Sequence, residues 1–172
     1  IERGVENAFE NVFSRALLSD LTPVELASGI KKAMDDRAAA VNRERVVVPN
    51  EFEVILAESD FDKIEGWGED AMRGELIDVA TQHAADQHYT FLGPIKVAFQ
   101  FDSELSRGKL IVRGRSKRGA VAPATTRDAT PENPIIDVDG ERYLLTGTVT
   151  VIGRGSSADI TVDDAGVSRQ HL

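Results

Sequence analysis

The first hydrophobic pattern along the chain has the spacing of an amphipathic helix. Thr22-Pro23-Val24-Glu25 follows it, combining a Thr that can cap a helix, Pro at the first helical position and Glu where it completes a capping box. The sequence therefore predicts two successive helices, the first over residues 2–18. Their apolar positions are Val5, Ala8, Phe9, Val12, Phe13, Ala16 and Leu17 in the first, and Leu26, Ala27, Ile30, Ala33, Met34 and Val41 in the second.

Strand patterns and a further helix follow up to residue 116. Pro49-Asn50 is a turn signal, and the alternation of apolar residues over 52–56 predicts a strand after it. Residues 59–62 indicate a cap before a short turn, and 67–89 has the apolar spacing of a third long helix. Residues 97–101 and 110–112 alternate on either side of a turn and predict a hairpin. This order of elements predicts an α+β domain over residues 1–116, with helices on one face of a small sheet.

The hydrophobic periodicity disappears between residues 117 and 134, where Ala, Thr, Pro and charged residues dominate. This composition predicts a semi-extended linker over 117–134. From residue 135 the pattern is all-β, because Asp139-Gly140 is a hairpin-turn dipeptide between two alternating runs. We expect two more strands, at 148–152 and 160–162.

Charge and composition limit the kinds of partner. The formal net charge is −9, and an acidic surface repels the phosphates of nucleic acid and of anionic lipids, so we expect no nucleic-acid partner. No apolar run approaches the roughly 20 residues of a membrane span, so we expect no direct membrane insertion. The chain has no cysteine, which excludes thiolate sites and fits a cytoplasmic setting. No residue spacing predicts a metal site or a cofactor.

An arginine between two glycines follows directly on the apolar run 148–152. A phosphorylated side chain carries nearly two negative charges and three acceptor oxygens, and a guanidinium can donate two parallel hydrogen bonds to it. Arg154 is placed to do so at the tip of a tight turn, and Ser168 offers a hydroxyl on the next predicted loop. Two loops on a rigid β-scaffold are a suitable place for recognition. Arg154 and Ser168 are therefore candidates for binding a phosphate group.

Two enzyme interpretations of the same residues are weaker. Gly153-x-Gly155-x-x-Ala158 matches a dinucleotide fingerprint, but that fingerprint requires a helix to begin at the loop, and 158–164 is short and rich in β-branched residues. Ser168 and His171 resemble a nucleophile and its base, yet nothing in the sequence supplies an orienting carboxylate or an oxyanion loop. We therefore expect a protein that is not an enzyme.

The combination Gly153-Arg154, Asp159-Ile160 and Ser168-Arg169-Gln170-His171 resembles the opening half of a forkhead-associated (FHA) domain. The resemblance implies an all-β sandwich that binds phosphothreonine peptides through Arg154 and Ser168, with Arg169 as a secondary contact. It also implies that Gly153 is the turn residue and that His171 is structural. Because such a sandwich needs about 100 residues, we expect 135–172 to be a partial FHA domain, truncated after its Ser-x-x-His motif.

The N-terminal part resembles FhaA-type proteins of actinobacteria, through a Leu-x-Pro-x-Glu-Leu segment (21–26), Pro-Asn-Glu-Phe (49–52) and Ser-Asp-Phe-Asp-Lys (59–63). Such proteins carry an N-terminal α+β domain of unknown function, a linker and an FHA domain. The resemblance implies a cytoplasmic adaptor in Ser/Thr-kinase signalling, linked to cell-wall synthesis or division, whose partners are phosphothreonine-containing proteins and a Ser/Thr protein kinase. The alternative is a structural or oligomerisation protein whose N-terminal domain is the functional unit, with a degenerate FHA module. The sequence leaves the oligomeric state open.

Two features lie outside the FHA motif. Thr125, in the predicted linker, has Asp128 three residues further on, and it is a candidate phosphosite that the FHA module of this or a neighbouring chain reads; the alternative is an unmodified polar linker. Arg113, Arg115, Lys117 and Arg118 form a basic cluster. This cluster is either a solvated strand end or a docking patch for an acidic or phosphorylated partner.

Overall fold

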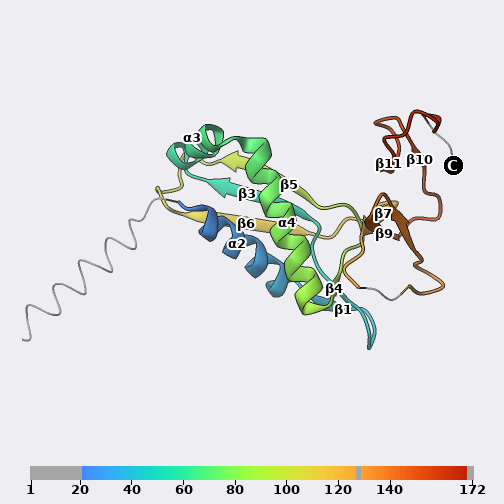
Figure 1. Cartoon of the computed structure of the whole chain (residues 1–172). Helices are drawn as coiled ribbons and strands as arrows, with labels where there is room; N and C mark the ends of the chain where they lie inside the picture. Colours follow the sequence, from blue (N-terminus) through green and yellow to red (C-terminus); the bar gives the residue numbers. More distant parts are fainter. Residues whose placement is uncertain (1–20, 127–128, 170–172) are drawn as a thin grey trace, which may run out of the picture.

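A computed structural model describes residues 21–126 and 129–169 (Figure 1). The helix predicted over 2–18 lies outside these residues. The elements in chain order are α2 (Pro23–Asp36), β1 (Ala39–Ala40), β2 (Val46–Val47), β3 (Glu51–Leu56), α3 (Glu58–Trp67), α4 (Glu69–Gln87), β4 (Tyr89–Thr90), β5 (Lys96–Phe101), β6 (Leu110–Arg115), β7 (Val121–Pro123), β8 (Ile135–Val138), β9 (Glu141–Leu145), β10 (Ile152–Gly153) and β11 (Ile160–Thr161).

Helix α2 begins where the sequence predicts it. The Thr22 hydroxyl accepts the Glu25 amide and the Glu25 carboxylate accepts the Thr22 amide, which completes the capping box. The helix ends at Asp36, so the expected place of Val41 on its apolar side is wrong, and that side chain is exposed. The buried residues of α2 are Leu26, Ile30, Ala33 and Met34.

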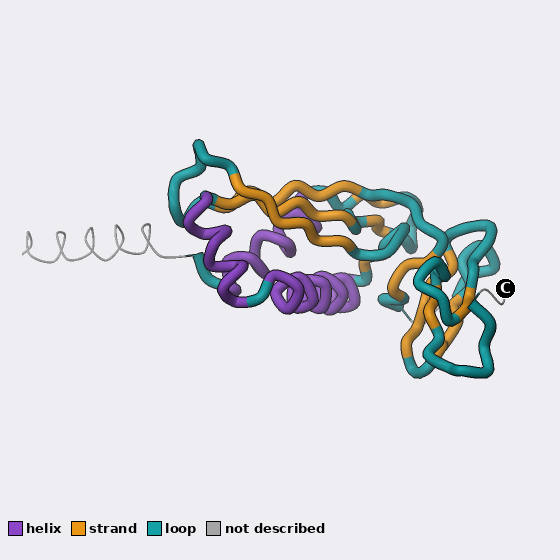
Figure 2. The backbone as a smooth tube through the Cα atoms, turned by 90° about the horizontal axis from the view of Figure 1, so that it is seen from above, coloured by secondary structure: helices purple, strands orange, loops and turns teal. Residues whose placement is uncertain are grey.

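The central sheet has the strand order β5-β3-β6, with β3 parallel to β5 and antiparallel to β6. The hairpin predicted from 97–101 and 110–112 is therefore wrong, because β3 lies between these two strands. Helices α2 and α4 contact the sheet on one face, and Figure 2 shows the other face of these strands free of helices. Alternate residues of β3 explain this layering: Phe52, Val54 and Leu56 are buried in the core. The predicted α+β class, with helices on one face of a small sheet, is confirmed for this part of the chain.

The region predicted as a short turn and one long helix contains two helices. Gly68 separates α3 from α4 with a φ of 96°, a conformation that glycine adopts without steric cost. No capping signal marks the start of α3, because its N-cap is Ala57 and no side chain caps it. Helix α4 ends at Gln87, and its C-cap residue His88 has a left-handed φ of 58°.

Part of the predicted linker is a strand. Residues of β7 pair with β9 in a second sheet of order β7-β9-β8, and Val121 and Ala122 are buried. Pro123 is tolerated because β7 is an edge strand of this sheet. Ala122 also joins the same hydrophobic cluster as the N-terminal helices. Residues 121–123 of the predicted semi-extended linker therefore belong to a sheet and pack against the core.

The hairpin predicted around Asp139-Gly140 is present as β8 and β9. Both turn residues have positive φ, 54° and 84°, as a two-residue hairpin turn requires. The strand expected over 148–152 is shorter: only β10 at its end is extended, and Val149 is 71% exposed. The structure thus describes a small β-rich part after residue 120 without the closed sandwich of an FHA domain.

Candidate functional site

The two segments that carry the candidate phosphate-binding residues lie next to each other. The Arg154 amide donates to the Ser168 carbonyl at 3.0 Å, and the Gly155 amide donates to the Arg169 carbonyl at 3.1 Å. Arg154, Ser168 and Arg169 therefore come from neighbouring backbone segments, although the first is well separated from the other two in sequence.

Arg154 directly follows a strand that is held firmly. Strand β10 pairs in parallel with β11, with Ile152 opposite Ile160, and Ile160 is 1% exposed. The Val151 amide donates to the Asp159 carboxylate at 2.8 Å, and the Val151 carbonyl accepts the amides of Asp159 and Ile160. Asp159 is part of the FHA-like motif, and its carboxylate thus also braces the start of β10.

The glycines beside Arg154 have different tasks. Gly153 is buried as the last residue of β10, and among the described residues positive φ in glycine occurs at Gly68, Gly108 and Gly140. The bend begins after Gly153, so the turn is one residue later than expected. A Cβ on Gly155 would lie 3.1 Å from the Arg169 carbonyl oxygen. Gly155 therefore permits the close approach of the two segments. The sequence places this glycine directly after Arg154 but does not show which segment it approaches.

A tight turn precedes Ser168. The Asp164 carboxylate accepts the Gly166 amide at 2.7 Å, and the Asp164 carbonyl accepts the Val167 amide at 3.1 Å. This turn directs Ser168 toward β10, where its carbonyl meets the Arg154 amide. Asp163 and Asp164 are exposed on the same loop, so the site combines two guanidinium groups with nearby carboxylates.

The side chains that would contact a phosphate are at the surface. Arg154, Ser168 and Arg169 are all exposed. Within residues 21–126 and 129–169, neither the Arg154 nor the Arg169 guanidinium has a hydrogen bond or an ion pair. An anion can therefore bind these groups without first displacing a partner from the described part of the chain.

Two further predicted residues are placed differently or not at all. His171 lies outside the described residues. Thr125 is half-buried, and its hydroxyl donates to the Tyr89 carbonyl. Thr125 therefore does not lie on an open part of the predicted linker, because the segment before it is held in β7.

The described residues offer little for the rival chemistries. The chain after Gly155 leads into β11 and not into a helix, which removes the dinucleotide interpretation. No group of three or more His, Asp or Glu side chains suited to a metal ion occurs in the described ranges. No helix among those residues is both long and apolar enough to cross a membrane.

Comparison with known proteins places the chain in a family. Residues 1–113 match the family model described as "FhaA, N-terminal domain", and the chain belongs to this family. It is similar to the FHA domain-containing protein FhaA of Mycobacterium tuberculosis (strain ATCC 25618 / H37Rv), with 26% identity over 137 residues. The match covers 80% of this chain and 24% of that protein, so the chain spans about a quarter of its relative's length.

A solved structure supports the fold of the N-terminal part. It is described as "Rv0020c_Nter structure" and has a TM-score of 0.51 and 22% sequence identity to this chain. The superposition covers 60% of this chain and 78% of that one. At this level of identity the likeness establishes the α+β fold alone. The family model and the M. tuberculosis relative confirm the prediction that the chain is an FhaA-type protein.

Proposed function

We propose that this protein is a phosphothreonine-dependent adaptor in Ser/Thr-kinase signalling. An FhaA-family N-terminal domain is joined to an FHA module, in which Arg154 and Ser168 bind the phosphate and Arg169 assists. One observation carries the proposal: two backbone hydrogen bonds hold the Arg154 turn against the Ser168–Arg169 segment.

The chemistry of these groups suits a phosphorylated side chain. A guanidinium donates two parallel hydrogen bonds to phosphate oxygens, and charge-assisted bonds of this kind are about twice as strong as neutral ones. Both guanidinium groups are exposed and have no internal partner among the described residues. Strand β10 holds the Arg154 backbone in place before the ligand arrives, which lowers the entropy cost of binding.

The wider role follows from the resemblance to FhaA-type proteins. In this proposal the adaptor works in the cytoplasm, binds phosphothreonine-containing partners of a Ser/Thr protein kinase, and contributes to the control of cell-wall synthesis or division. It uses no cofactor and catalyses no reaction.

Phosphorylation of Thr125 is a separate part of the proposal. The hydroxyl is engaged with the Tyr89 carbonyl, so a kinase requires local opening around β7 before it can reach this residue. Intact-mass analysis after kinase treatment tests this step, and absence of phosphate on residues 120–134 rejects it.

The central test is a titration of the full-length protein with a phosphothreonine peptide library by fluorescence polarisation. We expect Arg154→Ala to weaken binding at least about thirtyfold, since removal of one partner of a charged interface pair costs about 2–5 kcal/mol. Arg43→Ala is the matched control, because Arg43 is also exposed but lies between β1 and β2. Unphosphorylated and phosphoserine libraries complete the controls.

A different result supports the alternative function. If no phosphopeptide binds the full-length protein, the phosphothreonine proposal fails. Sedimentation that shows a dimer or larger species would then favour the structural or oligomerisation protein as the interpretation.

A further inference from the structure

The central sheet has one face without helices, here called the open face. The register places Glu51 of β3 between Lys96 of β5 and Arg115 of β6, and Glu53 between Ala98 and Arg113. Figure 2 shows the helices on the opposite side of these strands. Alternate residues of the same strands fill the core, so the charged residues share the open face.

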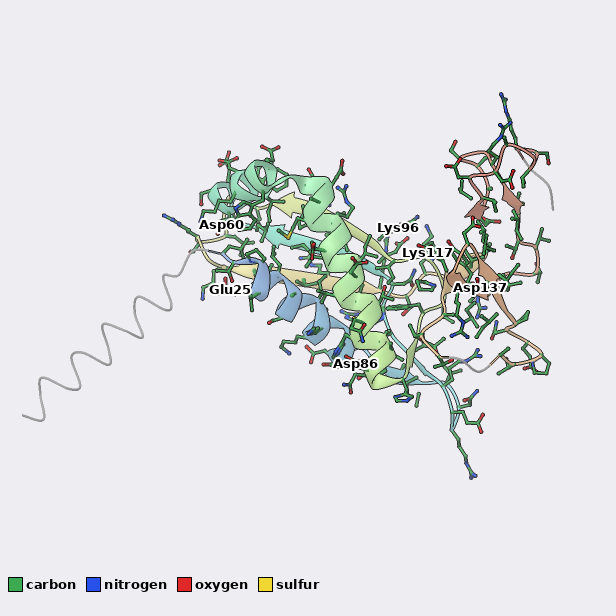
Figure 3. All side chains as sticks on the ribbon, viewed as in Figure 1. Glu25, Asp60, Asp86, Lys96, Lys117 and Asp137 are labelled. Carbon is green, nitrogen blue, oxygen red and sulfur yellow. The ribbon has the colours of Figure 1, made fainter. Side chains whose placement is uncertain are left out.

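A groove of about 810 Å³ lies on this surface. It contains residues of all three strands together with Lys117, and at the β5 edge it reaches Arg73 and Ile77 of α4. Lys96 and Lys117 are labelled in Figure 3 beside the point where the chain passes into β7. The groove therefore combines residues from well-separated parts of the sequence.

The cations of the open face are only partly neutralised. The Glu51 carboxylate accepts two bonds from Arg115, whose Nε and Nη2 both lie 2.7 Å from Oε2. The other contacts are long: Lys96 Nζ is 3.8 Å from Glu51, and Arg113 Nη1 is 3.5 Å from Glu53. The side chains of Lys96 and Arg113 are 65% and 66% exposed.

Lys117 adds a charge that no described residue balances. Its ammonium has no hydrogen bond or ion pair with any residue in 21–126 or 129–169. The neighbouring Arg118 does not belong to this surface, because its guanidinium donates to the Thr146 carbonyl at 3.2 Å. The open face thus presents four cations against two carboxylates, on a chain whose net charge is −9.

The spacing of these cations matches an extended peptide. Arg113 and Arg115 are alternate residues of β6, and Lys117 lies two residues further on, just past the end of the strand. Alternate residues of a strand are about 6.8 Å apart, which is also the repeat of alternate side chains on an extended ligand. Toward the other end the face becomes less charged, with Ile111 39% exposed opposite Ile55.

We propose that the open face binds an acidic segment of a partner protein in extended conformation, with Asp or Glu at alternate positions and an aliphatic residue at one end. The carboxylates of Glu51 and Glu53 lie among the cations and would repel the continuous phosphate backbone of a nucleic acid. A peptide with acidic side chains only at alternate positions can place its charges between these two carboxylates. A protein segment also fits the apolar end around Ile111.

The experiment uses the full-length protein and a fluorescein-labelled peptide, Glu-Gln-Glu-Gln-Glu-Gln-Val, at low salt, in which Val shares the face of the three Glu side chains. The same peptide with Gln in place of Glu is the ligand control. The test variant is Arg113→Gln with Lys117→Gln. The matched control is Lys31→Gln with Arg43→Gln, which removes the same charge from exposed residues elsewhere. Thermal melts show whether each variant is folded.

We expect the acidic peptide to bind with a Kd below about 1 mM, and the test variant to bind at least about tenfold more weakly, because two charge contacts are lost. The control variant should stay within about twofold. Equal losses in both variants, or no binding of the acidic peptide, would overturn the proposal. Tighter binding of a single-stranded oligonucleotide at the same salt would overturn it in favour of nucleic acid.

This surface is independent of the phosphothreonine proposal. The acidic peptide carries no phosphate, and we expect Arg154→Ala to bind it like the unsubstituted protein. Loss of peptide binding in Arg154→Ala would instead assign the peptide to the FHA module and reject the open face.

Discussion

Asp60 is a carboxylate with no exposure to solvent, and its removal should be costly. It lies in the first turn of α3, and its side chain is 0% exposed. The carboxylate accepts the Gly108 amide at 2.6 Å and lies 3.2 Å from Lys63 Nζ. Gly108 belongs to the turn between β5 and β6, where its φ is 76°. Asp60 thus fastens a helix to the loop that joins β5 to β6, two strands that flank β3 and do not pair with each other.

The two contacts set the expected magnitude. A hydrogen bond to a charged group contributes about 1.5–3 kcal/mol. The Lys63 contact lies at the low end, since that side chain is 26% exposed. Asp60→Ala also leaves the Gly108 amide without its acceptor, so we expect a loss of about 3 kcal/mol in the free energy of unfolding. Asp60→Asn keeps an acceptor oxygen and should lose about 1 kcal/mol.

Urea unfolding followed by circular dichroism measures both values. The exposed Asp62 is the matched control, and Asp62→Ala should change the free energy of unfolding by less than about 0.5 kcal/mol. Hydrogen exchange provides a local readout, because the Gly108 amide should lose protection in Asp60→Ala. If Asp60→Ala were as stable as Asp62→Ala, the reasoning from burial and hydrogen bonding would be refuted.

Three other predictions concern glycine packing and pH. Gly93→Ala places a Cβ 2.5 Å from the Lys117 carbonyl oxygen and should lower the free energy of unfolding by about 2 kcal/mol. In Gly74→Ala, within α4, the added Cβ meets no atom within 4 Å, so this variant should raise the free energy of unfolding by about 0.8 kcal/mol. Equal melting temperatures of the two variants would contradict both predictions. Partial burial raises the pKa of Asp35, but hydrogen bonds from His83 and Tyr89 outweigh it and hold this pKa below 3.8. The ionised Asp35 carboxylate should therefore stabilise the fold above pH 3.8, and this contribution should shrink as the pH falls. The difference in free energy of unfolding between the unsubstituted protein and Asp35→Asn should follow the same pH dependence, and a pH-independent difference in urea unfolding would rule this out. The hydrogen bond to Glu141, aided by burial, raises the pKa of Tyr143 to about 12, so absorbance titration of a Tyr89→Phe variant should give that value and Glu141→Gln should lower it.

Local signals in the sequence predicted the local parts of the fold. The capping box at Thr22 and the turn at Asp139-Gly140 both depend on residues within one turn of each other, and both are present. Helix α3 was missed because Ala57 provides no side-chain cap. Strand β7 was missed because it is stabilised by pairing with β9, and no pattern within residues 117–134 shows that partner.

The candidate site shows the same division. The types and spacing of Arg154, Ser168 and Arg169 were sufficient to select them as candidates. Their proximity depends on hydrogen bonds between distant segments and on the missing side chain of Gly155. The open face could not be predicted from the sequence for a similar reason, because its residues come from three separate strands, β3, β5 and β6. In the sequence, only the residues from Arg113 onward form a basic cluster.

The anchored passage from β6 to β7 changes how this protein can be cut into parts. The Lys117 amide donates to the buried Asn50 side chain, the Gly119 amide to the Leu92 carbonyl, and the Ala120 carbonyl accepts two amides from the start of the loop after β9. A protease needs an unpaired, extended stretch, and this one is already paired on both sides. A fragment ending at residue 116 would leave the Asn50 side-chain oxygen without this partner and uncover part of the core near Ala122. A stable N-terminal fragment should therefore include the residues after 116, where the sequence alone predicts the start of a linker.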